Sequence, residues 1–143
     1  MINSYYKIPL ETKKIIDNEN VKKSNIRESI SDYIHLIVTT HFGECSFDES
    51  FGCSIWDVDF DNLTSTNKLR DLISESLRLN ISTQEKRLKK TQIKVTIRQE
   101  EFNEGKKLKR VKKRVDIKID GIVRQTNEAF SCIERFYIAP LSY

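Results

Sequence analysis

The chain has 143 residues, of which 38% are hydrophobic and 32% charged, and a formal net charge of +4. This length is typical of one domain, and the low apolar share predicts a small core and a large solvated or partner-facing surface. Four glycines and two prolines exclude a collagenous or low-complexity chain, and no apolar run approaches the roughly 20 residues of a membrane span. Three cysteines indicate reduced thiols, and the first ten residues lack the order of a signal peptide, so we expect a cytoplasmic protein.

Charge is divided into blocks along the chain. Residues 1–85 carry 9 Lys and Arg against 14 Asp and Glu, whereas residues 86–114 carry 13 against 3. Residues 44–61 contain six acids and neither Lys nor Arg. The basic block is suited to nucleic acid, an anionic membrane surface or an acidic protein. Surfaces of opposite sign favour directional assembly with protein partners.

Two helices are predicted ahead of the basic block. Apolar residues recur at three- and four-residue steps over residues 24–40, with Ser24 as the expected N-cap. The same period covers residues 66–79, with Leu72 on the buried face and Asn80 as the expected C-cap.

Alternating apolar and polar residues then predict antiparallel strands. The strand candidates are residues 93–97, 108–119, 122–125 and 132–139. We expect a hairpin turn at residues 103–105, a bulge near Lys112 and Lys113, and a second tight turn at Asp120-Gly121.

The order of these elements predicts the fold class. Two helices followed by a meander indicate an α+β fold, with two main helices packed on an antiparallel β-sheet meander. We expect a single domain at residues 24–143, preceded by an N-terminal extension at residues 1–23.

No pattern in the sequence predicts a catalytic residue, a metal site or a cofactor. His35 and His41 are six residues apart, whereas helical metal sites use a spacing of four. The cysteines form no CxxC pair, so buried structural thiols are the more common case. The acids of residues 44–61 suggest the paired carboxylates of a glycoside hydrolase, but one tryptophan and four glycines offer little to build a sugar cleft.

The basic block has three interpretations, and the first is a nucleic-acid-binding surface. Lys109, Arg110, Lys112 and Lys113 lie on a predicted strand rather than on a helix that would enter a groove. Few aromatic residues stand among them, whereas single-strand binders use several stacking rings. A solvated hairpin whose charge prevents edge pairing and a surface that docks an acidic protein are the other two interpretations.

One stretch of sequence is distinctive. Thr39-Thr40-His41-Phe42-Gly43-Glu44 ends the first helix, and Phe51-Gly52-Cys53-Ser54-Ile55-Trp56 follows a short acidic loop. With the Ser29-Ile30 pair of the helix, this order resembles the baseplate wedge family shared by contractile phage tails and type VI secretion systems, where the subunit is called TssE. The resemblance extends over residues 24–140. The residues that we expect to anchor the loop are Gly43, Glu44, Phe51, Gly52, Ile55 and Trp56.

The same family carries a Glu-Pro-Arg motif before its first long strand. Here the motif is Glu85-Lys86-Arg87, with Glu and Arg retained and Pro replaced. The resemblance implies that Glu85 and Arg87 form ion pairs at a subunit junction, and an internal salt bridge at the strand entry is the alternative. With a partner contact, Arg87→Glu should abolish assembly and leave the free domain folded.

The resemblance implies a non-enzymatic structural subunit. Such a subunit would sit beside larger wedge proteins (TssF and TssG in secretion systems) and initiate assembly of the contractile sheath. The expected partner-binding residues are Glu85, Arg87, Lys109, Arg110, Lys112 and Lys113. Some relatives are labelled lysozymes, although no residues here support that activity. A nucleic-acid-binding module that uses residues 86–114 and a small peptidoglycan hydrolase stay as the alternatives.

Overall fold

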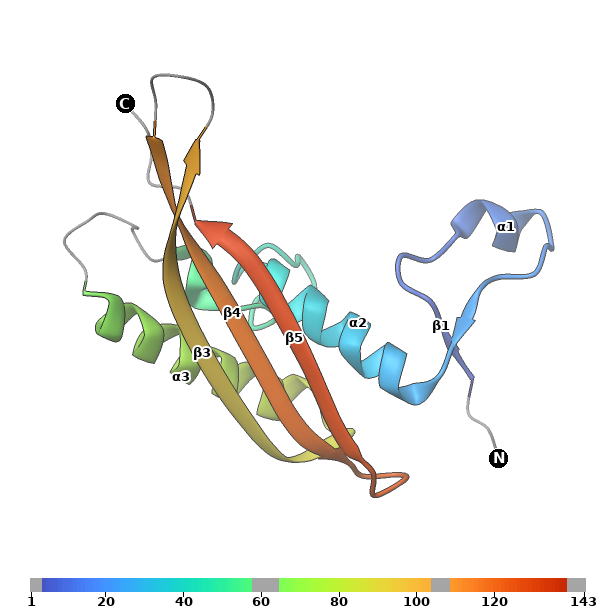
Figure 1. Ribbon diagram of the computed structural model, residues 1–143. Coiled ribbons are helices and arrows are strands. Elements are labelled where there is room, and N and C mark those ends of the chain that lie inside the picture. Colours follow the sequence, from blue (N-terminus) through green and yellow to red (C-terminus); the bar gives the residue numbers. More distant parts are fainter. Residues whose placement is uncertain (1–3, 58–64, 104–108, 139–143) are drawn as a thin grey trace.

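The computed structural model describes residues 4–57, 65–103 and 109–138. In chain order its elements are β1 (Tyr5–Tyr6), α1 (Thr12–Ile16), β2 (Lys23–Ser24), α2 (Ile26–Thr39), the 3-10 helix η1 (Ser54–Asp57), α3 (Thr66–Gln84), β3 (Leu88–Asn103), β4 (Lys109–Val123) and β5 (Ala129–Ile138). The predicted α+β fold is confirmed (Figure 1).

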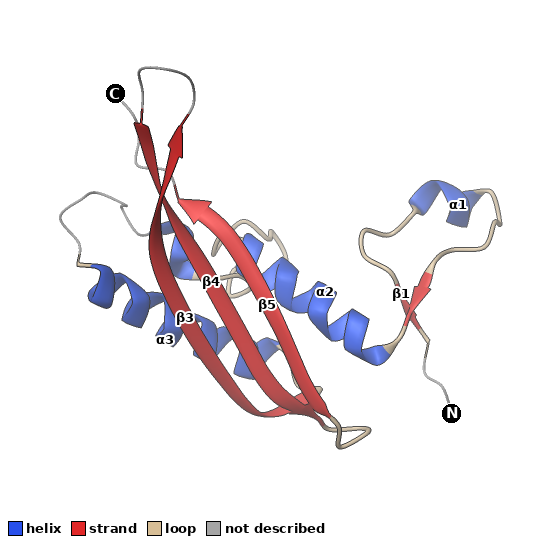
Figure 2. Ribbon diagram, in the orientation of Figure 1, coloured by secondary structure: helices blue, strands red, loops and turns tan. Residues whose placement is uncertain are grey.

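Strands β3, β4 and β5 form an antiparallel sheet in which β4 is central. Helices α2 and α3 pack together on one face of this sheet (Figure 2). Apolar side chains that alternate along the strands, such as Val115, Ile117 and Ile119 of β4, meet the apolar stripes of the helices in one core. The intervening side chains of each strand point to the opposite face.

Helix α2 begins one residue later than predicted. Asn25, and not Ser24, is the N-cap, and its side chain accepts a hydrogen bond of 2.9 Å from the backbone N–H of Glu28. Ser24 instead lies in β2 and is buried. An amide side chain satisfies the free N–H groups of a helix start as well as a hydroxyl does.

Helix α3 is longer than predicted. It continues past Asn80 to Gln84, and Glu85 is its C-cap. Asn80 is buried within the helix, where its side-chain amide donates to the backbone oxygen of Ser76. The predicted buried face was also wrong at Leu72, which is 46% exposed, because the apolar stripe follows Leu69, Ile73, Leu77 and Ile81.

Two predictions about the sheet were wrong. Asp120-Gly121 is not a turn, because β4 passes through it and Gly121 pairs with Phe130. The chain reverses after Val123, where Asn127 takes the left-handed φ of 56°. The expected bulge at Lys112 and Lys113 is also wrong: both pair in register, and the irregularity lies between Lys89 and Gln92 of β3.

Strand β3 passes beside position 121. A Cβ atom built on Gly121 would lie 3.4 Å from the backbone oxygen of Lys89. This is an ordinary van der Waals distance, so Gly121 is a residue within a strand and not part of a turn. The first predicted turn, at residues 103–105, lies largely outside the described residues.

The first part of the chain forms a small arm. Tyr5 and Tyr6 of β1 pair with Ser24 and Lys23 of β2, and α1 lies between the two strands in the sequence. The arm extends from the N-terminal end of α2 (Figure 1). Lys7 joins it to α2 through an ion pair of 3.0 Å with Asp32. Among the described residues, none of the helices has both the length and the apolar composition that a bilayer span requires.

Candidate functional site

Glu85 and Arg87 form an ion pair at the junction of α3 and β3. The guanidinium Nε donates to Glu85 Oε1 at 2.8 Å, and Nη2 donates to Glu85 Oε2 at 2.6 Å. The backbone N–H of Arg87 donates to the same carboxylate at 3.0 Å. These hydrogen bonds raise the pKa of Arg87 above its usual range, although partial burial opposes the shift. Two parallel N–H···O bonds are the strongest form of this contact.

Two other segments contact the same guanidinium. Its Nη1 donates to Ser29 Oγ of α2 at 2.8 Å. The rings of Tyr5 in β1 and Tyr33 in α2 lie 5.3 Å and 5.9 Å from its central carbon, in the range of cation–π contact. The residue therefore connects β1, α2, α3 and the start of β3.

In the free chain, Glu85 and Arg87 form the internal salt bridge that was the alternative interpretation of the motif. The Glu85 side chain is 1% exposed and its partner is in the same chain. Arg87 keeps 29% of its side-chain surface exposed. Contact of Glu85 or Arg87 with a partner protein stays a prediction. The exposed part of Arg87 is the surface that such a partner would reach.

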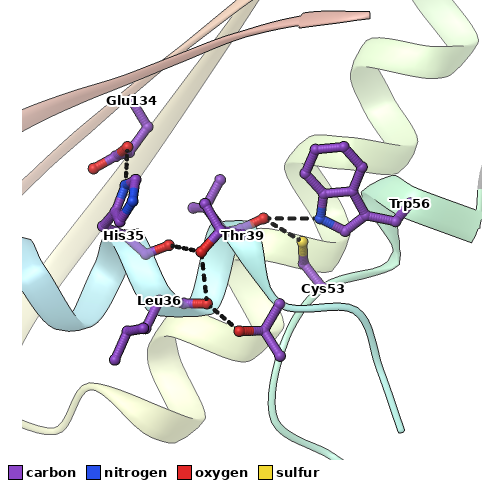
Figure 3. Close-up of polar contacts among 8 residues, drawn as sticks. His35, Leu36, Thr39, Cys53, Trp56 and Glu134 are labelled. Atoms are coloured by element: carbon purple, nitrogen blue, oxygen red, sulfur yellow. Dashed lines mark hydrogen bonds and ion pairs between the residues drawn. The ribbon is translucent and has the colours of Figure 1, made fainter. Parts of the chain in front are cut away.

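The end of α2 is closed by the segment that the family resemblance singled out. Cys53 Sγ and Trp56 Nε1 both donate to the backbone oxygen of Val38, at 3.2 Å and 3.1 Å (Figure 3). The hydroxyls of Thr39 and Thr40 donate to carbonyls one turn earlier. The last four carbonyls of a helix have no partner within it. Thr40 supplies one for Leu36, and Cys53 and Trp56 supply one for Val38.

The loop between these residues is fixed by its own hydrogen bonds. Glu44 Oε2 accepts from the backbone N–H of His41 at 2.9 Å, and Asp48 accepts from the backbone and hydroxyl of Ser50. The bonds to Ser50 contribute most to lowering the pKa of Asp48, against some burial. Phe51 packs against Tyr33, with ring centroids 5.7 Å apart. Among the described acids of this loop, these two carboxylates therefore hold the backbone in place.

Two glycines allow the loop to fold back on α2. Gly43 and Gly52 have φ values of +79° and +123°. A Cβ atom on Gly52 would lie 2.6 Å from the backbone oxygen of Thr40, whereas one on Gly43 would meet nothing within 4 Å. Gly52 is therefore required by both conformation and space, and Gly43 by conformation alone.

Of the two expected loop anchors in η1, Ile55 and Trp56, only the first is fully buried. Ile55 is fully buried, whereas Trp56 is 40% exposed, with its ring 5.5 Å from that of Phe136 on β5.

We expect Trp56→Ala to lower the free energy of unfolding by about 1–3 kcal/mol, which is less than the loss expected for a fully buried tryptophan. Urea unfolding followed by circular dichroism measures this loss. Trp56→Phe should cost about 1 kcal/mol, for the hydrogen bond alone. Equal losses in the two variants would show that the ring contact contributes nothing.

The predicted basic residues follow the central strand. Lys112 and Lys113 pair with Glu100 and Gln99 of β3, and both side chains are partly buried. Lys109 and Arg110 belong to the same strand, and their side chains lie outside the described part. Contact of these four residues with a partner stays a prediction.

The remaining chemical candidates have structural contacts. His35 Nδ1 lies 2.8 Å from Glu134 Oε2, which joins α2 to β5 (Figure 3). Burial raises the pKa of Cys132 to about 12, so its thiol is not a nucleophile at neutral pH. Within the described ranges, no three His, Cys, Asp or Glu side chains are grouped as a metal site.

A charged network that sequence reasoning missed covers the sheet face opposite the helices. Asp116 accepts from Arg135 Nε at 2.7 Å and from Arg114 Nε at 3.1 Å, and Arg114 also contacts Glu100. Partial burial opposes the shift, but Arg135 and Arg114 lower the pKa of Asp116 below its usual range. The alternating charges of β4 were visible in the sequence, and the register was needed to bring Arg135 beside them.

Taken together, the contacts describe a small scaffold domain, in which charged side chains join helices to a sheet. The family model of Baseplate wedge protein gp25 matches residues 24–128. The chain therefore belongs to this family, and its role is structural, in the baseplate of a contractile tail.

A solved structure supports the fold. The crystal structure of a protein from Geobacter sulfurreducens, provisionally named a tail lysozyme, superposes with a TM-score of 0.59 and 24% sequence identity. The match covers 86% of this chain and 100% of the other. At this identity the likeness concerns the fold alone. A comparison with curated protein sequences gives no match.

Proposed function

We propose that the chain is a non-enzymatic, cytoplasmic wedge subunit that binds larger wedge proteins of the TssF and TssG kind and starts the contractile sheath by accepting a strand at the edge of its sheet. The observation that carries the proposal is that β5 is an edge strand of the described sheet, in a chain of the baseplate wedge family. Main-chain hydrogen bonds to an added strand would supply the affinity. The expected contacts of Glu85, Arg87 and the basic strand belong to the same proposal.

The two edges of the sheet differ in charge. Strand β3 carries Lys89, Lys90, Lys94 and Arg98, whereas Arg135 is the single cation of β5. Lysines along an edge discourage pairing with another chain. The β5 edge is therefore the better acceptor of a sheath strand.

The hydrogen bonds of the last hairpin indicate which backbone groups face outward on β5. The backbone N–H of Val123 donates to the oxygen of Glu128 at 2.9 Å, which makes this an inward-facing pair. Antiparallel strands alternate, so odd-numbered residues of β5 direct their N–H and C=O away from β4. Consistently, the oxygen of Ala129 accepts from Arg27 of α2 at 2.9 Å. The N–H of Ile133 then lies on the outer edge.

Substitution of Ile133 by proline tests this edge. Ile133→Pro removes one outward N–H and no hydrogen bond to β4, so we expect the free domain to stay folded and sheath assembly to be lost. Assembly is measured by sedimentation and electron microscopy of sheaths formed on reconstituted baseplates, and folding by circular dichroism.

Ile133→Thr is the matched control. It alters the same side chain, which is 62% exposed, and keeps both the N–H and a β-branched residue. We expect sheath to form with this variant, because the outward N–H is retained. If Ile133→Pro assembles sheath as well as Ile133→Thr does, the β5 edge is not the acceptor.

A further inference from the structure

The face of the sheet opposite the helices is a second surface with a defined pattern. The register places three rows of side chains side by side across the strands. From one end to the other the rows are Arg98, Arg114 and Tyr137, then Thr96, Asp116 and Arg135, then Lys94, Lys118 and Ile133. We call these nine residues the outer sheet patch.

The outer sheet patch is strongly cationic. It contains five Lys and Arg side chains and one carboxylate, that of Asp116. At its borders, Glu100 and Asp120 pair with Arg114 and Lys118. Arg114 and Arg135 are oriented by Asp116, so their guanidinium groups are held in place before any partner binds. For Lys94 and Arg98, both exposed, the part of the chain that the structure describes provides no ion pair. Their charges are available to a partner.

Two large side chains within the patch are also exposed. Ile133 is 62% and Tyr137 47% exposed, on either side of Arg135 along β5. Tyrosine and arginine are the residue types that dominate the binding energy of protein interfaces. In the described part of the chain, the helices pack on the other face and no element covers this one (Figure 1).

We propose that the outer sheet patch docks an acidic segment of another baseplate protein, an inference that rests on the proposed function. Charge complementarity selects the occupant: Lys94 and Arg98, exposed and without an ion pair in the described part of the chain, favour carboxylates opposite them. Ile133 and Tyr137 provide the apolar contact that a nucleic acid backbone would not use. With a single aromatic ring, the patch lacks the stacking platform of a single-strand binder.

A photo-reactive residue at Tyr137 tests the proposal. The full chain carrying p-benzoylphenylalanine at position 137 is expressed with the baseplate proteins of its host, irradiated, and analysed by mass spectrometry of the purified baseplates. We expect a cross-link to a protein segment in which Asp and Glu outnumber Lys and Arg. Leu72 on α3 is the control position, because its exposure of 46% matches the 47% of Tyr137 on the opposite side of the domain.

Charge reversal separates a specific contact from proximity. Lys94→Glu with Arg98→Glu should reduce the yield of this cross-link on the order of 10- to 100-fold, whereas Lys13→Glu with Lys68→Glu, the same charge change elsewhere, should not. Thermal melting verifies that each variant is folded. If the variant with the photo-reactive residue at position 137 is not folded, the residue is placed at position 133 instead.

Each other outcome contradicts the proposal. A cross-link to nucleic acid, to a segment without an acidic excess or to an acidic segment that ignores the charge reversal overturns it. So does the absence of any cross-link in baseplates that contain the chain. If the purified baseplates do not contain the chain, the proposed function is overturned as well. If they contain the chain but show no cross-link, only the docking of an acidic segment is overturned.

Discussion

We expect Arg87→Glu to destabilise the isolated domain by about 3–5 kcal/mol, because it leaves the buried carboxylate of Glu85 without its cation and places a second carboxylate beside it. The Glu85 side chain is 1% exposed, so water cannot replace the lost hydrogen bonds. The change also removes the contact with Ser29 and the cation–π contacts with Tyr5 and Tyr33. Urea unfolding of the free chain, followed by circular dichroism, measures the loss. This expectation replaces the one drawn from sequence, in which the free domain tolerates the reversal.

Two variants make this result specific to the buried pair. Arg78→Glu reverses an arginine that is also bound through two nitrogens to a glutamate, but both side chains are about 60% exposed, so its melting temperature should stay close to that of the wild type. Arg87→Lys keeps the charge but loses the two parallel hydrogen bonds to Glu85. We expect it to lower the free energy of unfolding by an intermediate amount, about 1–2 kcal/mol. If Arg87→Glu melts like Arg78→Glu, the pair does not brace the domain, and a role in partner contacts becomes the better explanation of the motif.

The helices and strands were predictable because their residues repeat with the period of the structure. The stripe of Ile30, Ile34 and Ile37 and the alternation of Ile117 and Ile119 each reflect one buried face. Ends and turns were less predictable, because several residues compete for one role. Asp120-Gly121 has the sequence of a tight turn, and only the register of β4 with β5 shows that the strand continues through it.

The motif at Glu85 was visible in the sequence, but its surroundings were not. Ser29 lies 58 residues from Arg87, and nothing in the local pattern of α2 indicates that its hydroxyl accepts from a guanidinium. The same holds for Arg135 and Asp116, which meet across β4 and β5. Side chains that meet through the register of a sheet or the packing of a helix can be assigned only when the fold is known.

The glycine at position 52 provides the second large expected effect. At a φ of +123° an L-residue is strained, and this conformation alone should cost Gly52→Ala about 1–3 kcal/mol. The new Cβ would also lie 2.6 Å from the backbone oxygen of Thr40, a carbonyl that already accepts from the N–H of Cys53 at 2.9 Å. The backbone would have to move, and the bond that joins the loop to the end of α2 would lengthen. We therefore expect a loss at the upper end of this range or above it.

Gly43→Ala is the matched control within the same loop. Gly43 also has a positive φ, of +79°, but a Cβ there meets nothing within 4 Å, so its substitution should cost only the left-handed conformation, about 1–2 kcal/mol. Urea unfolding of both variants gives the difference, and amide hydrogen exchange at Cys53 reports whether the closing bond is weakened. We expect faster exchange at Cys53 in Gly52→Ala and not in Gly43→Ala. Equal losses with unchanged exchange would mean that the loop yields without strain, and that its packing on α2 does not depend on the close approach at Gly52.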